Sequence, residues 1–232
     1  MKSGFDQYAD RYDAWFMANS NVLASEAALV ASTLHDAGRI LSVGCGSGLF
    51  ESILRADYGI DIRDGIEPSE GMAAIARKRG IDVTIATAED ADFGDHAFDT
   101  ILFNGTPSYI TDLAAVVRKA YEALPAGGRI VLIDVPKESS YGILYNLAKA
   151  LGTWEHPLLE GCYPANPYPI EFVNAANWRT TAEKTAILED AGFTALKYSQ
   201  TLTRHPLCSD AAAEEPSEGA DRGDYVAICA WK

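Results

Sequence analysis

Short apolar runs alternate with longer amphipathic stretches along most of this chain. Residues 21–35 repeat apolar side chains about every three or four positions, the spacing of one helix face. These positions are Val22, Leu23, Ala27, Val30 and Leu34. Strands are predicted at 40–44, 61–66, 82–86, 99–104 and 128–134, with helices at 49–56, 70–79 and 111–123 between them. Strands that alternate with helices build a parallel sheet, so the pattern predicts an α/β fold.

The C-terminal part of the chain departs from this alternation. After a predicted helix at 180–191, two strand patterns at 195–203 and 224–231 follow with no helix between them. Strands connected in this way are expected to pair antiparallel. The connection itself, 204–223, is acidic and contains Pro, and loops of this length are uncommon inside a domain. It is predicted to be either a disordered or solvated hairpin tip, or a functional flap.

The first predicted strand ends in a turn with glycines at alternate positions. Residues 43–48 read Val-Gly-Cys-Gly-Ser-Gly, and a predicted helix begins directly after them. Gly44, Gly46 and Gly48 carry no Cβ and adopt positive φ readily, so the chain can turn sharply and a ligand can approach it closely. The free N–H groups of the next helix face the same place. The pattern therefore predicts a site for a nucleotide-like cofactor.

The spacing of the glycines restricts which cofactor binds. A nicotinamide dinucleotide fingerprint requires Gly-x-Gly-x-x-Gly, but Phe50 and Glu51 stand where its third glycine is expected. The second predicted strand is followed by Glu67, roughly 20 residues beyond the glycines, where a carboxylate in such folds accepts hydrogen bonds from ribose hydroxyls. The order and spacing of these two features make the cofactor hypothesis much stronger than either feature alone.

With these motifs the chain resembles the class I S-adenosylmethionine-dependent methyltransferases. Within that family it most resembles the small-molecule branch that includes the ubiquinone and menaquinone biosynthesis methyltransferases. The matching motifs are residues 43–48, the acidic second motif at 65–72, the adenine-binding loop at 86–93 with the strand at 98–102, and the turn and strand at 125–134. An N-terminal pattern fits as well, formed by Phe5, Asp6, Ala9, Tyr12, Asp13, Trp15 and Phe16. The resemblance spans most of the chain and weakens between 137 and 179.

This resemblance implies a Rossmann-like doubly wound sheet, mostly parallel with a C-terminal antiparallel strand, helices on both faces and a lid insertion after the fifth strand. It also assigns roles to residues of the glycine turn, which is expected to pass under the methionine moiety of the cofactor. That turn consists of Gly44, Cys45, Gly46 and Gly48, with Cys45 as the small residue that the turn requires. Glu67 is expected to bind both ribose hydroxyls, and Pro68 and Met72 to line the adenosine face.

Recognition of the adenine ring departs from the family pattern. The loop after the third strand often supplies an Asp to the adenine amino group, but this chain has Thr87 and Ala88 there. The backbone N–H of Ala88, with Glu89 nearby, is expected to take over this contact. Asn104 is expected to help hold the methionine end of the cofactor.

Tyr12 is expected to close over the methionine end from an N-terminal helix. The alternative for Tyr12 and Trp15 is ordinary packing of an amphipathic helix.

Residues 137–179 are rich in aromatic side chains and follow the fifth strand, outside whose carboxyl end ligands bind in open α/β sheets. We interpret this segment as a lid over the substrate, with Tyr141, Tyr145, Trp154 and Tyr163 lining an apolar pocket. The alternative is an extra helix packed on the sheet edge. A lid aligns donor and acceptor and excludes water, so the expected acceptor is a small, apolar or aromatic molecule.

No side chain is clearly marked as a general base, so the catalytic residue stays unknown. His156 is the best-placed candidate in the substrate segment because an imidazole titrates near neutrality. Its alternative role is that of a surface or capping residue.

Composition agrees with a single domain over 1–232, of which 1–36 form an N-terminal helical cap: the chain has 232 residues and 48% apolar content. It contains no run of about 18 apolar residues and no apolar N-terminal segment, which predicts a cytoplasmic protein without integral membrane association. A net charge of −14 disfavours nucleic acid as a partner. Its four cysteines form no Cys-x-x-Cys pair, so no metal site is predicted.

The sequence thus predicts a methyltransferase that uses S-adenosylmethionine and a small-molecule acceptor, as a monomer or a homodimer. Two alternatives remain. A binding module that keeps the cofactor but lacks transfer activity would show the same glycines. A nicotinamide-dependent oxidoreductase shares the glycine turn and the acidic residue, but the missing third glycine and the terminal antiparallel pair count against it.

Overall fold

The computed structural model describes residues 9–232, so Phe5 and Asp6 of the N-terminal pattern lie outside the described residues. Two helices precede the sheet, α1 (Ala9–Ala18) and α2 (Ser20–Thr33). Helix α2 agrees with the predicted helix at 21–35, and the five apolar positions on which that prediction rests are buried.

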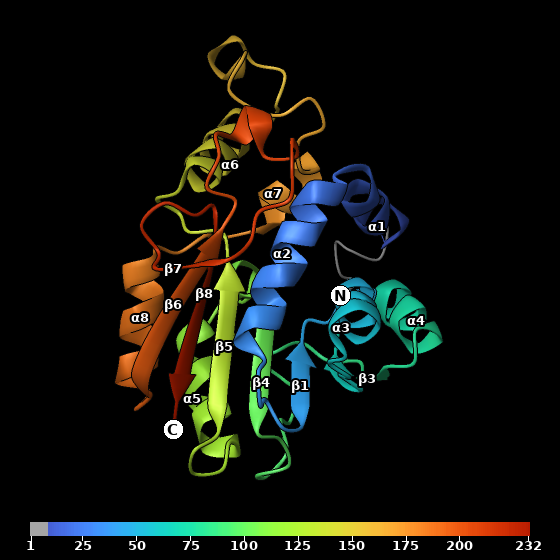
Figure 1. The fold of residues 1–232 in the computed structure, drawn as a ribbon, viewed down its shortest axis with the longest axis vertical. Coiled ribbons are helices and arrows are strands. Elements are labelled where there is room, and N and C mark those ends of the chain that lie inside the picture. The colour runs from blue at the N-terminus through green and yellow to red at the C-terminus, as the bar shows by residue number, and fades with distance from the viewer. Residues whose placement is uncertain (1–8) are drawn as a thin grey trace.

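An open sheet forms the centre of the fold (Figure 1). Its strands are β1 (Ile40–Val43), β2 (Asp64–Ile66), β3 (Asp82–Thr84), β4 (Thr100–Asn104), β5 (Arg129–Asp134), β6 (Thr194–Thr201), β7 (Ser217–Glu218) and β8 (Tyr225–Trp231). The strand order is β3-β2-β1-β4-β5-β8-β6-β7. Strands β1 to β5 run parallel, whereas β8 pairs antiparallel with β5 and with β6. The predicted Rossmann-like class and the antiparallel ending are confirmed.

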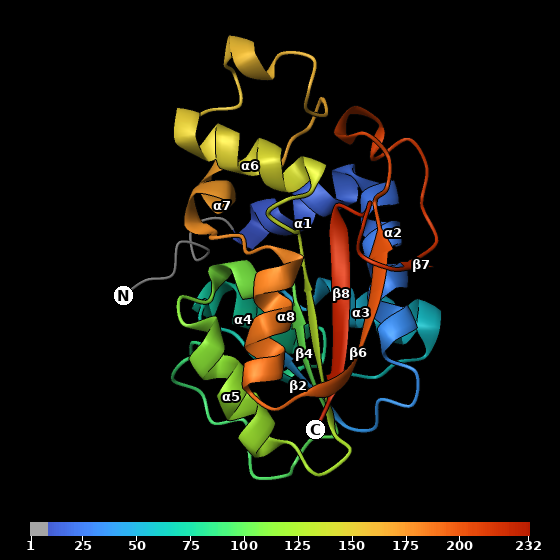
Figure 2. The same ribbon diagram turned by 90° about the vertical axis from the view of Figure 1, so that its left-hand side faces the viewer.

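Helices cover both faces of this sheet, as Figure 2 shows. They are α3 (Leu49–Tyr58), α4 (Glu70–Lys78), α5 (Leu113–Ala123) and α8 (Thr181–Asp190). Helices α2 and α3 pack on one face in a core that includes Val131 and Ile133, while α5 and α8 pack on the other face with Ile130 and Leu132. Because β5 is buried on both faces, it is a continuous apolar run rather than an alternating one.

Residues 137–179 form a layer above the ends to which the parallel strands point (Figures 1 and 2). They contain α6 (Ser140–Leu151), a short 3-10 helix at Pro157–Leu159 and α7 (Ile170–Ala175). The segment lies over the carboxyl ends of the strands, where the lid interpretation requires it. The alternative position on the sheet edge is wrong.

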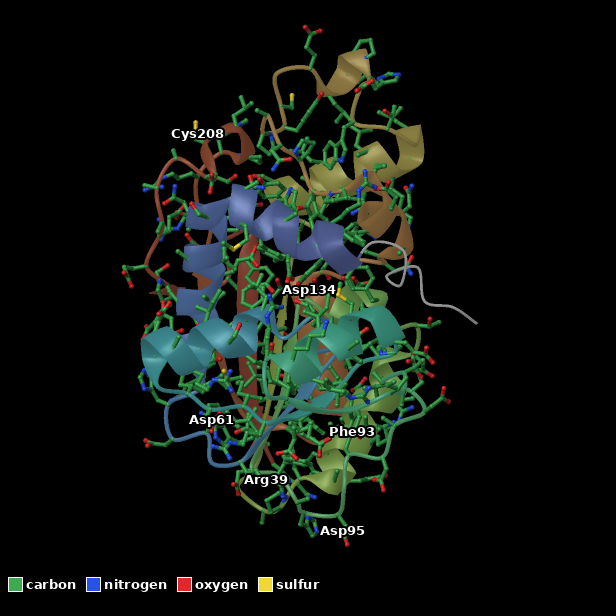
Figure 3. The ribbon with its side chains drawn as sticks, turned by 90° about the vertical axis from the view of Figure 1, so that its right-hand side faces the viewer. Arg39, Asp61, Phe93, Asp95, Asp134 and Cys208 are labelled. Carbon is green, nitrogen blue, oxygen red and sulfur yellow. The ribbon has the colours of Figure 1, made fainter. Side chains whose placement is uncertain are left out.

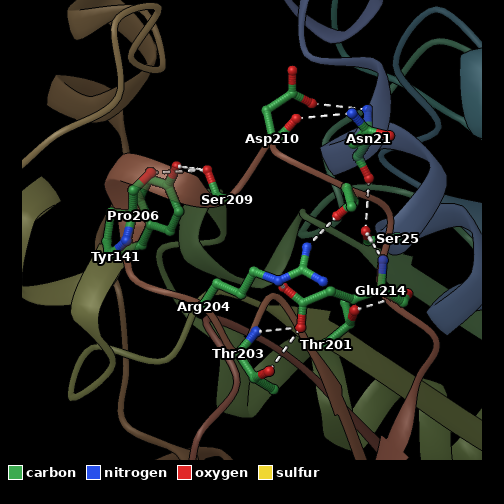
Figure 4. Close-up of polar contacts among 11 residues, drawn as sticks. Asn21, Ser25, Tyr141, Thr201, Thr203, Arg204, Pro206, Ser209, Asp210 and Glu214 are labelled. Atoms are coloured by element: carbon green, nitrogen blue, oxygen red, sulfur yellow. Dashed lines mark hydrogen bonds and ion pairs between the residues drawn. The ribbon is translucent and has the colours of Figure 1, made fainter.

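The connection 204–223 is structured rather than a disordered hairpin tip. It contains β7 and a short 3-10 helix at Pro206–Cys208. Its Asp210 carboxylate accepts hydrogen bonds of 2.8 and 3.0 Å from two backbone N–H groups in the first turn of α2, and the backbone N–H of Glu214 donates to Ser25 (2.8 Å; Figure 4). The segment therefore fixes one end of α2.

Candidate active site

A cavity of about 900 Å³, including its open mouth, lies at the carboxyl ends of the parallel strands. Several elements far apart in the sequence enclose it: the turn after β1, the end of β4, helices α1 and α2, and the layer formed by 137–179. Figure 3 places Asp134, at the end of β5, near the middle of the molecule, whereas Arg39 and Asp95 lie toward its lower end. The cavity therefore occupies the position where open α/β sheets bind ligands.

The cavity brings together many of the residues that the sequence assigned to the cofactor. Those that line it are Tyr12, Gly44, Gly46, Glu67, Pro68, Met72 and Asn104. These residues come from α1 and from the ends of β1, β2 and β4, with Met72 in the first turn of α4. Cys45, Gly48, Ala88 and Glu89 do not line it.

Two glycines of the turn have different functions. Gly46 has φ +56°, and a Cβ placed on it would meet no atom within 4 Å, so the main chain is open to a ligand there. Gly48 has φ +72°, and its Cβ would lie 2.4 Å from Cδ1 of Ile81. Gly48 therefore permits close packing of the start of α3. The sequence predicted that Gly48 would border the cofactor, but in the structure it does not line the cavity.

Glu67 is fixed at the cavity wall by backbone groups on both sides. Its Oε2 accepts a hydrogen bond from the N–H of Gly46 (3.0 Å), and its Oε1 accepts one from the N–H of Ser69 (2.8 Å). The side chain is almost fully buried. These contacts hold the carboxylate beside the glycine turn. A ligand that binds the Glu67 carboxylate therefore also lies close to the glycine turn.

Asn104 lies at the end of β4 and also lines the cavity. Strand β1 lies between β2 and β4, so Glu67 and Asn104 come from the strands on either side of the strand that leads into the glycine turn. The Oδ1 of Asn104 accepts a hydrogen bond from the hydroxyl of Tyr225 on β8 (2.8 Å). This contact fixes the orientation of the amide beside Gly44.

The residues predicted to contact adenine, Ala88 and Glu89, are not part of the cavity lining. Ala88 is buried in the core, and its carbonyl accepts a hydrogen bond from Lys119 (2.6 Å). The Glu89 carboxylate accepts one from the backbone N–H of Thr111 (3.0 Å). Cys45 is also buried, and this burial raises the pKa of its thiol. Ala88 and Cys45 are therefore part of the packing, whereas Glu89 is exposed, and none of the three lines the cavity.

Helix α1 is anchored to the glycine turn. The Asp13 carboxylate accepts hydrogen bonds from the hydroxyl of Ser47 (2.5 Å) and from Arg79 (2.7 Å), and Arg79 also donates to the carbonyl of Ser47 (2.8 Å). The anchored helix places Tyr12 and Trp15 on the cavity lining. Trp15 also has a packing role, because its indole N–H donates to a carbonyl of the 137–179 layer.

Aromatic side chains form the upper wall of the cavity. Tyr145 of α6, Tyr168 and Trp178 line it together. The ring centroids of Tyr145 and Trp178 lie 4.9 Å apart, and those of Tyr145 and Tyr168 lie 6.0 Å apart. Of the residues that the sequence assigned to the substrate, Tyr145 lines the cavity.

Tyr141, Trp154 and Tyr163 do not line it, contrary to expectation. The hydroxyl of Tyr141 is hydrogen-bonded to Ser209 of the 204–223 connection (2.7 Å; Figure 4). The indole N–H of Trp154 donates to the carbonyl of Tyr168 (2.8 Å), and the ring of Tyr163 packs against Trp154 at a tilt, with centroids 5.3 Å apart. These three side chains support the aromatic wall from behind.

His156 is also separate from the cavity. Its Nδ1 accepts a hydrogen bond from the backbone N–H of Leu158 (3.2 Å), so it caps the short 3-10 helix. This position agrees with the alternative that His156 is a capping residue.

Two acidic residues that sequence reasoning missed line the cavity, Glu26 on α2 and Asp134 on β5. They are 8% and 3% exposed. Burial, together with the negative charge of Asp134, raises the pKa of Glu26 from 4.5 to about 8. Burial raises the pKa of Asp134, which the charge of Lys184 partly offsets. A signal existed for Glu26, because it is an acid among the apolar positions of the predicted helix 21–35.

Among residues 9–232, no group of three or more His, Cys, Asp or Glu side chains is arranged to hold a metal ion. Within the same part of the chain, no helix has the length and apolar character needed to cross a membrane.

A family profile described as a methyltransferase domain matches residues 17–198. The chain is a class I S-adenosylmethionine-dependent methyltransferase. The family predicted from the glycine turn and the acidic second motif is thereby confirmed, and the nicotinamide-dependent alternative is wrong. The alternative of a binding module without transfer activity is likewise set aside, because the family is one of enzymes.

Two relatives of this methyltransferase match nearly the whole chain, and a third matches about half of it. A crystal structure from Thermotoga maritima, described as an S-adenosylmethionine-dependent methyltransferase and possible histamine N-methyltransferase, has a TM-score of 0.82 and 30% identity over 99% of this chain and 98% of that one. An uncharacterized protein of Methanocaldococcus jannaschii is 31% identical over 98% of both chains. Phosphoethanolamine N-methyltransferase 3 of Arabidopsis thaliana is 25% identical over 57% of this chain and 28% of its own length.

The cofactor of the methyltransferase is S-adenosylmethionine, and the lining of the cavity fits it. The open main chain at Gly46 leaves room for close approach of a ligand. The carboxylate of Glu67 borders the same space, where ribose hydroxyls are held in related nucleotide sites.

Proposed function

We propose that this enzyme transfers a methyl group to a small molecule that enters the aromatic part of the cavity. One observation carries the proposal: the glycine turn and the aromatic wall line a single continuous space, with Gly46 and Glu67 at one side and Tyr145 and Trp178 at the other. A donor held on the turn and an acceptor held on the wall would therefore share one compartment.

The proposed contacts to the cofactor follow from this lining. The turn at Gly44 and Gly46 would lie under the methionine moiety, Glu67 would accept the ribose hydroxyls, and Pro68 and Met72 would border the adenosine. S-adenosylmethionine supplies, when bound, an electrophilic methyl group on a positively charged sulfur. The chain contributes alignment and the exclusion of water, which together account for much of the rate in reactions of this kind.

Helices α6 and α7 act in this proposal as the lid over the acceptor. An aromatic, largely apolar wall with few polar groups is typical of small-molecule sites. The resemblance to the quinone-biosynthesis branch and the T. maritima neighbour described as a possible histamine N-methyltransferase both favour a small acceptor with a ring.

Calorimetry with the purified protein tests the cofactor side of this proposal. We expect S-adenosylmethionine and S-adenosylhomocysteine to bind, and NAD to give no heat. A screen for methyl transfer from labelled S-adenosylmethionine then tests the acceptor side, with small aromatic compounds compared with protein and RNA. Binding of NAD alone, or methylation of macromolecules alone, would contradict the proposal.

A further inference from the structure

The charges around the aromatic part of the cavity are all of one sign. Glu26 and Asp134 face this space, and among the described residues that line it there is no Lys, Arg or His. A phosphate or carboxylate group would find no cation to pair with there. A cation would find carboxyl groups and the faces of aromatic rings, which attract positive charge.

Glu26 has no partner of its own within the described residues. It is 8% exposed and lines the cavity, and its carboxyl group forms no hydrogen bond or ion pair with any residue of 9–232. The Asp134 carboxylate, in contrast, accepts a hydrogen bond from the backbone N–H of Val135 (2.9 Å). Glu26 is therefore the carboxyl group with which a ligand would form a hydrogen bond or an ion pair.

Resting on the proposed function, we infer that the acceptor is a small aromatic amine that enters as a cation, pairs with Glu26 and gives its proton to this carboxylate before methyl transfer. Glu26 would then act as a catalytic residue. Asp134, whose carboxylate already accepts a hydrogen bond from the backbone N–H of Val135, would add a second carboxyl group near the cation.

The titratable groups near Glu26 are Asp134 of β5 and the phenols of Tyr12 on α1, Tyr141 and Tyr145 on α6, Tyr168, and Tyr225 on β8. Burial raises the pKa of Asp134 as well. Burial raises the pKa of each phenol above its ordinary value, so these groups stay neutral in the physiological range. The raised pKa of Glu26, about 8, brings it closer to that of an amine, so the proton can pass between the two.

The reaction balances with these groups alone. The ammonium transfers one proton to the Glu26 carboxylate, which frees the nitrogen lone pair. That pair forms the new nitrogen–carbon bond, while the electrons of the broken sulfur–carbon bond remain on sulfur and neutralise its charge. The product is a methylated ammonium, and the proton on Glu26 leaves to water when the cavity opens.

Binding of matched ligands to the enzyme saturated with S-adenosylhomocysteine tests this inference without turnover. The probes are histamine, tyramine and tryptamine, each paired with the alcohol that has a hydroxyl in place of the amino group, and phosphoethanolamine as an amine with a phosphate. We expect at least one aromatic amine to bind about 10- to 100-fold more tightly than its alcohol, and phosphoethanolamine not to bind. If every alcohol binds as well as its amine, or if no aromatic amine binds, the inference is overturned.

The Glu26→Gln variant keeps the shape of the side chain and removes its charge. It should lose the preference for amine over alcohol and leave the affinity for S-adenosylhomocysteine unchanged. Its kcat/KM should rise with pH up to the pKa of the free amine, whereas that of the wild type levels off near pH 8. Glu122→Gln, an exposed change of the same charge on α5, is the control and should alter none of these values.

A drop in S-adenosylhomocysteine affinity in Glu26→Gln would assign Glu26 to the cofactor and overturn the inference. These outcomes are distinct from failure of the proposed function. If S-adenosylhomocysteine does not bind the wild type, the function itself is wrong; if it binds and only alcohols or phenols are methylated, the amine inference alone fails.

Discussion

At the scale of single residues, Glu67 connects the end of β2 to the glycine turn through the backbone N–H groups of Gly46 and Ser69. Replacing Glu67 by Ala should weaken S-adenosylhomocysteine binding by about 1–3 kcal/mol, because charge-assisted hydrogen bonds to the ribose disappear. Calorimetric titration measures this loss. Glu67→Gln keeps one acceptor oxygen and should lose less, and an equal affinity in all three proteins would show that Glu67 does not contact the cofactor.

Glu67 and Glu26 also show how far the sequence reveals individual residues. Glu67 was predictable because it follows a short strand at a fixed distance from the glycine turn. Glu26 was missed because the pattern of a helix shows which of its faces is apolar, but does not show which residues of other elements contact that face. Its environment comes from Tyr225 and Asp134, which are distant in the sequence and reach it only through the order of the strands.

At the scale of elements, the N-terminus of α2 is capped by another part of the chain. Asn19, at the N-cap position, makes no capping hydrogen bond with its side chain, and Asp210 instead accepts from the N–H groups of Asn21 and Val22. Asp210→Ala should lower the free energy of unfolding by about 1 kcal/mol, because these groups lose a charged acceptor. Chemical denaturation measures the change.

The exposed Glu215, in the same segment, provides a matched control with the same change of charge. Glu215→Ala should leave the free energy of unfolding nearly unchanged. Equal losses in both variants would assign the effect to net charge and not to the cap.

Elements were predicted well where one local pattern determines them. Strand β5 was expected at 128–134 and lies at Arg129–Asp134, because a fully buried parallel strand is a continuous apolar run. In the 137–179 layer, no local pattern determined which aromatic side chains line the cavity. Tyr141 and Tyr145 are four residues apart and share one face of α6, with ring centroids 5.2 Å apart, so periodicity cannot separate them. Only Tyr145 lines the cavity. The first turn of α6, which holds Tyr141, is bound instead to the distant C-terminal region, where Asp224 accepts the backbone N–H of Tyr141 (2.7 Å).

At the scale of the whole molecule, Glu26 makes stability depend on pH. Its pKa is about 8 in the folded protein against 4.5 as its ordinary value, so the folded state binds the proton more tightly than the unfolded state does. The contribution of Glu26 is fully favourable below pH 4.5 and is lost as the pH rises through 8. From pH 5 to pH 9, Glu26→Gln should gain stability relative to the wild type by roughly 4 kcal/mol.

Denaturation curves of both proteins at pH 5 and pH 9 measure this difference. Parallel pH profiles would mean that Glu26 is solvated in the folded protein, in conflict with its burial. Exposed carboxylates contribute equally to both proteins and cancel in the comparison.

The cap that Asp210 places on α2 has a consequence for the order in which the enzyme matures on the ribosome. The glycine turn, Glu67 and Asn104 all belong to residues 40–134, so the nucleotide half of the cavity has its parts once the middle of the chain has emerged. Helix α2 is synthesised earlier, but its cap is formed by Asp210, which lies near the C-terminal end of the sequence. Tyr225, which lines the cavity together with Glu26, is synthesised later still. A nascent chain stalled before residue 200 would therefore carry the donor side of the site without a finished acceptor side, and methylation would begin only after synthesis has passed Tyr225.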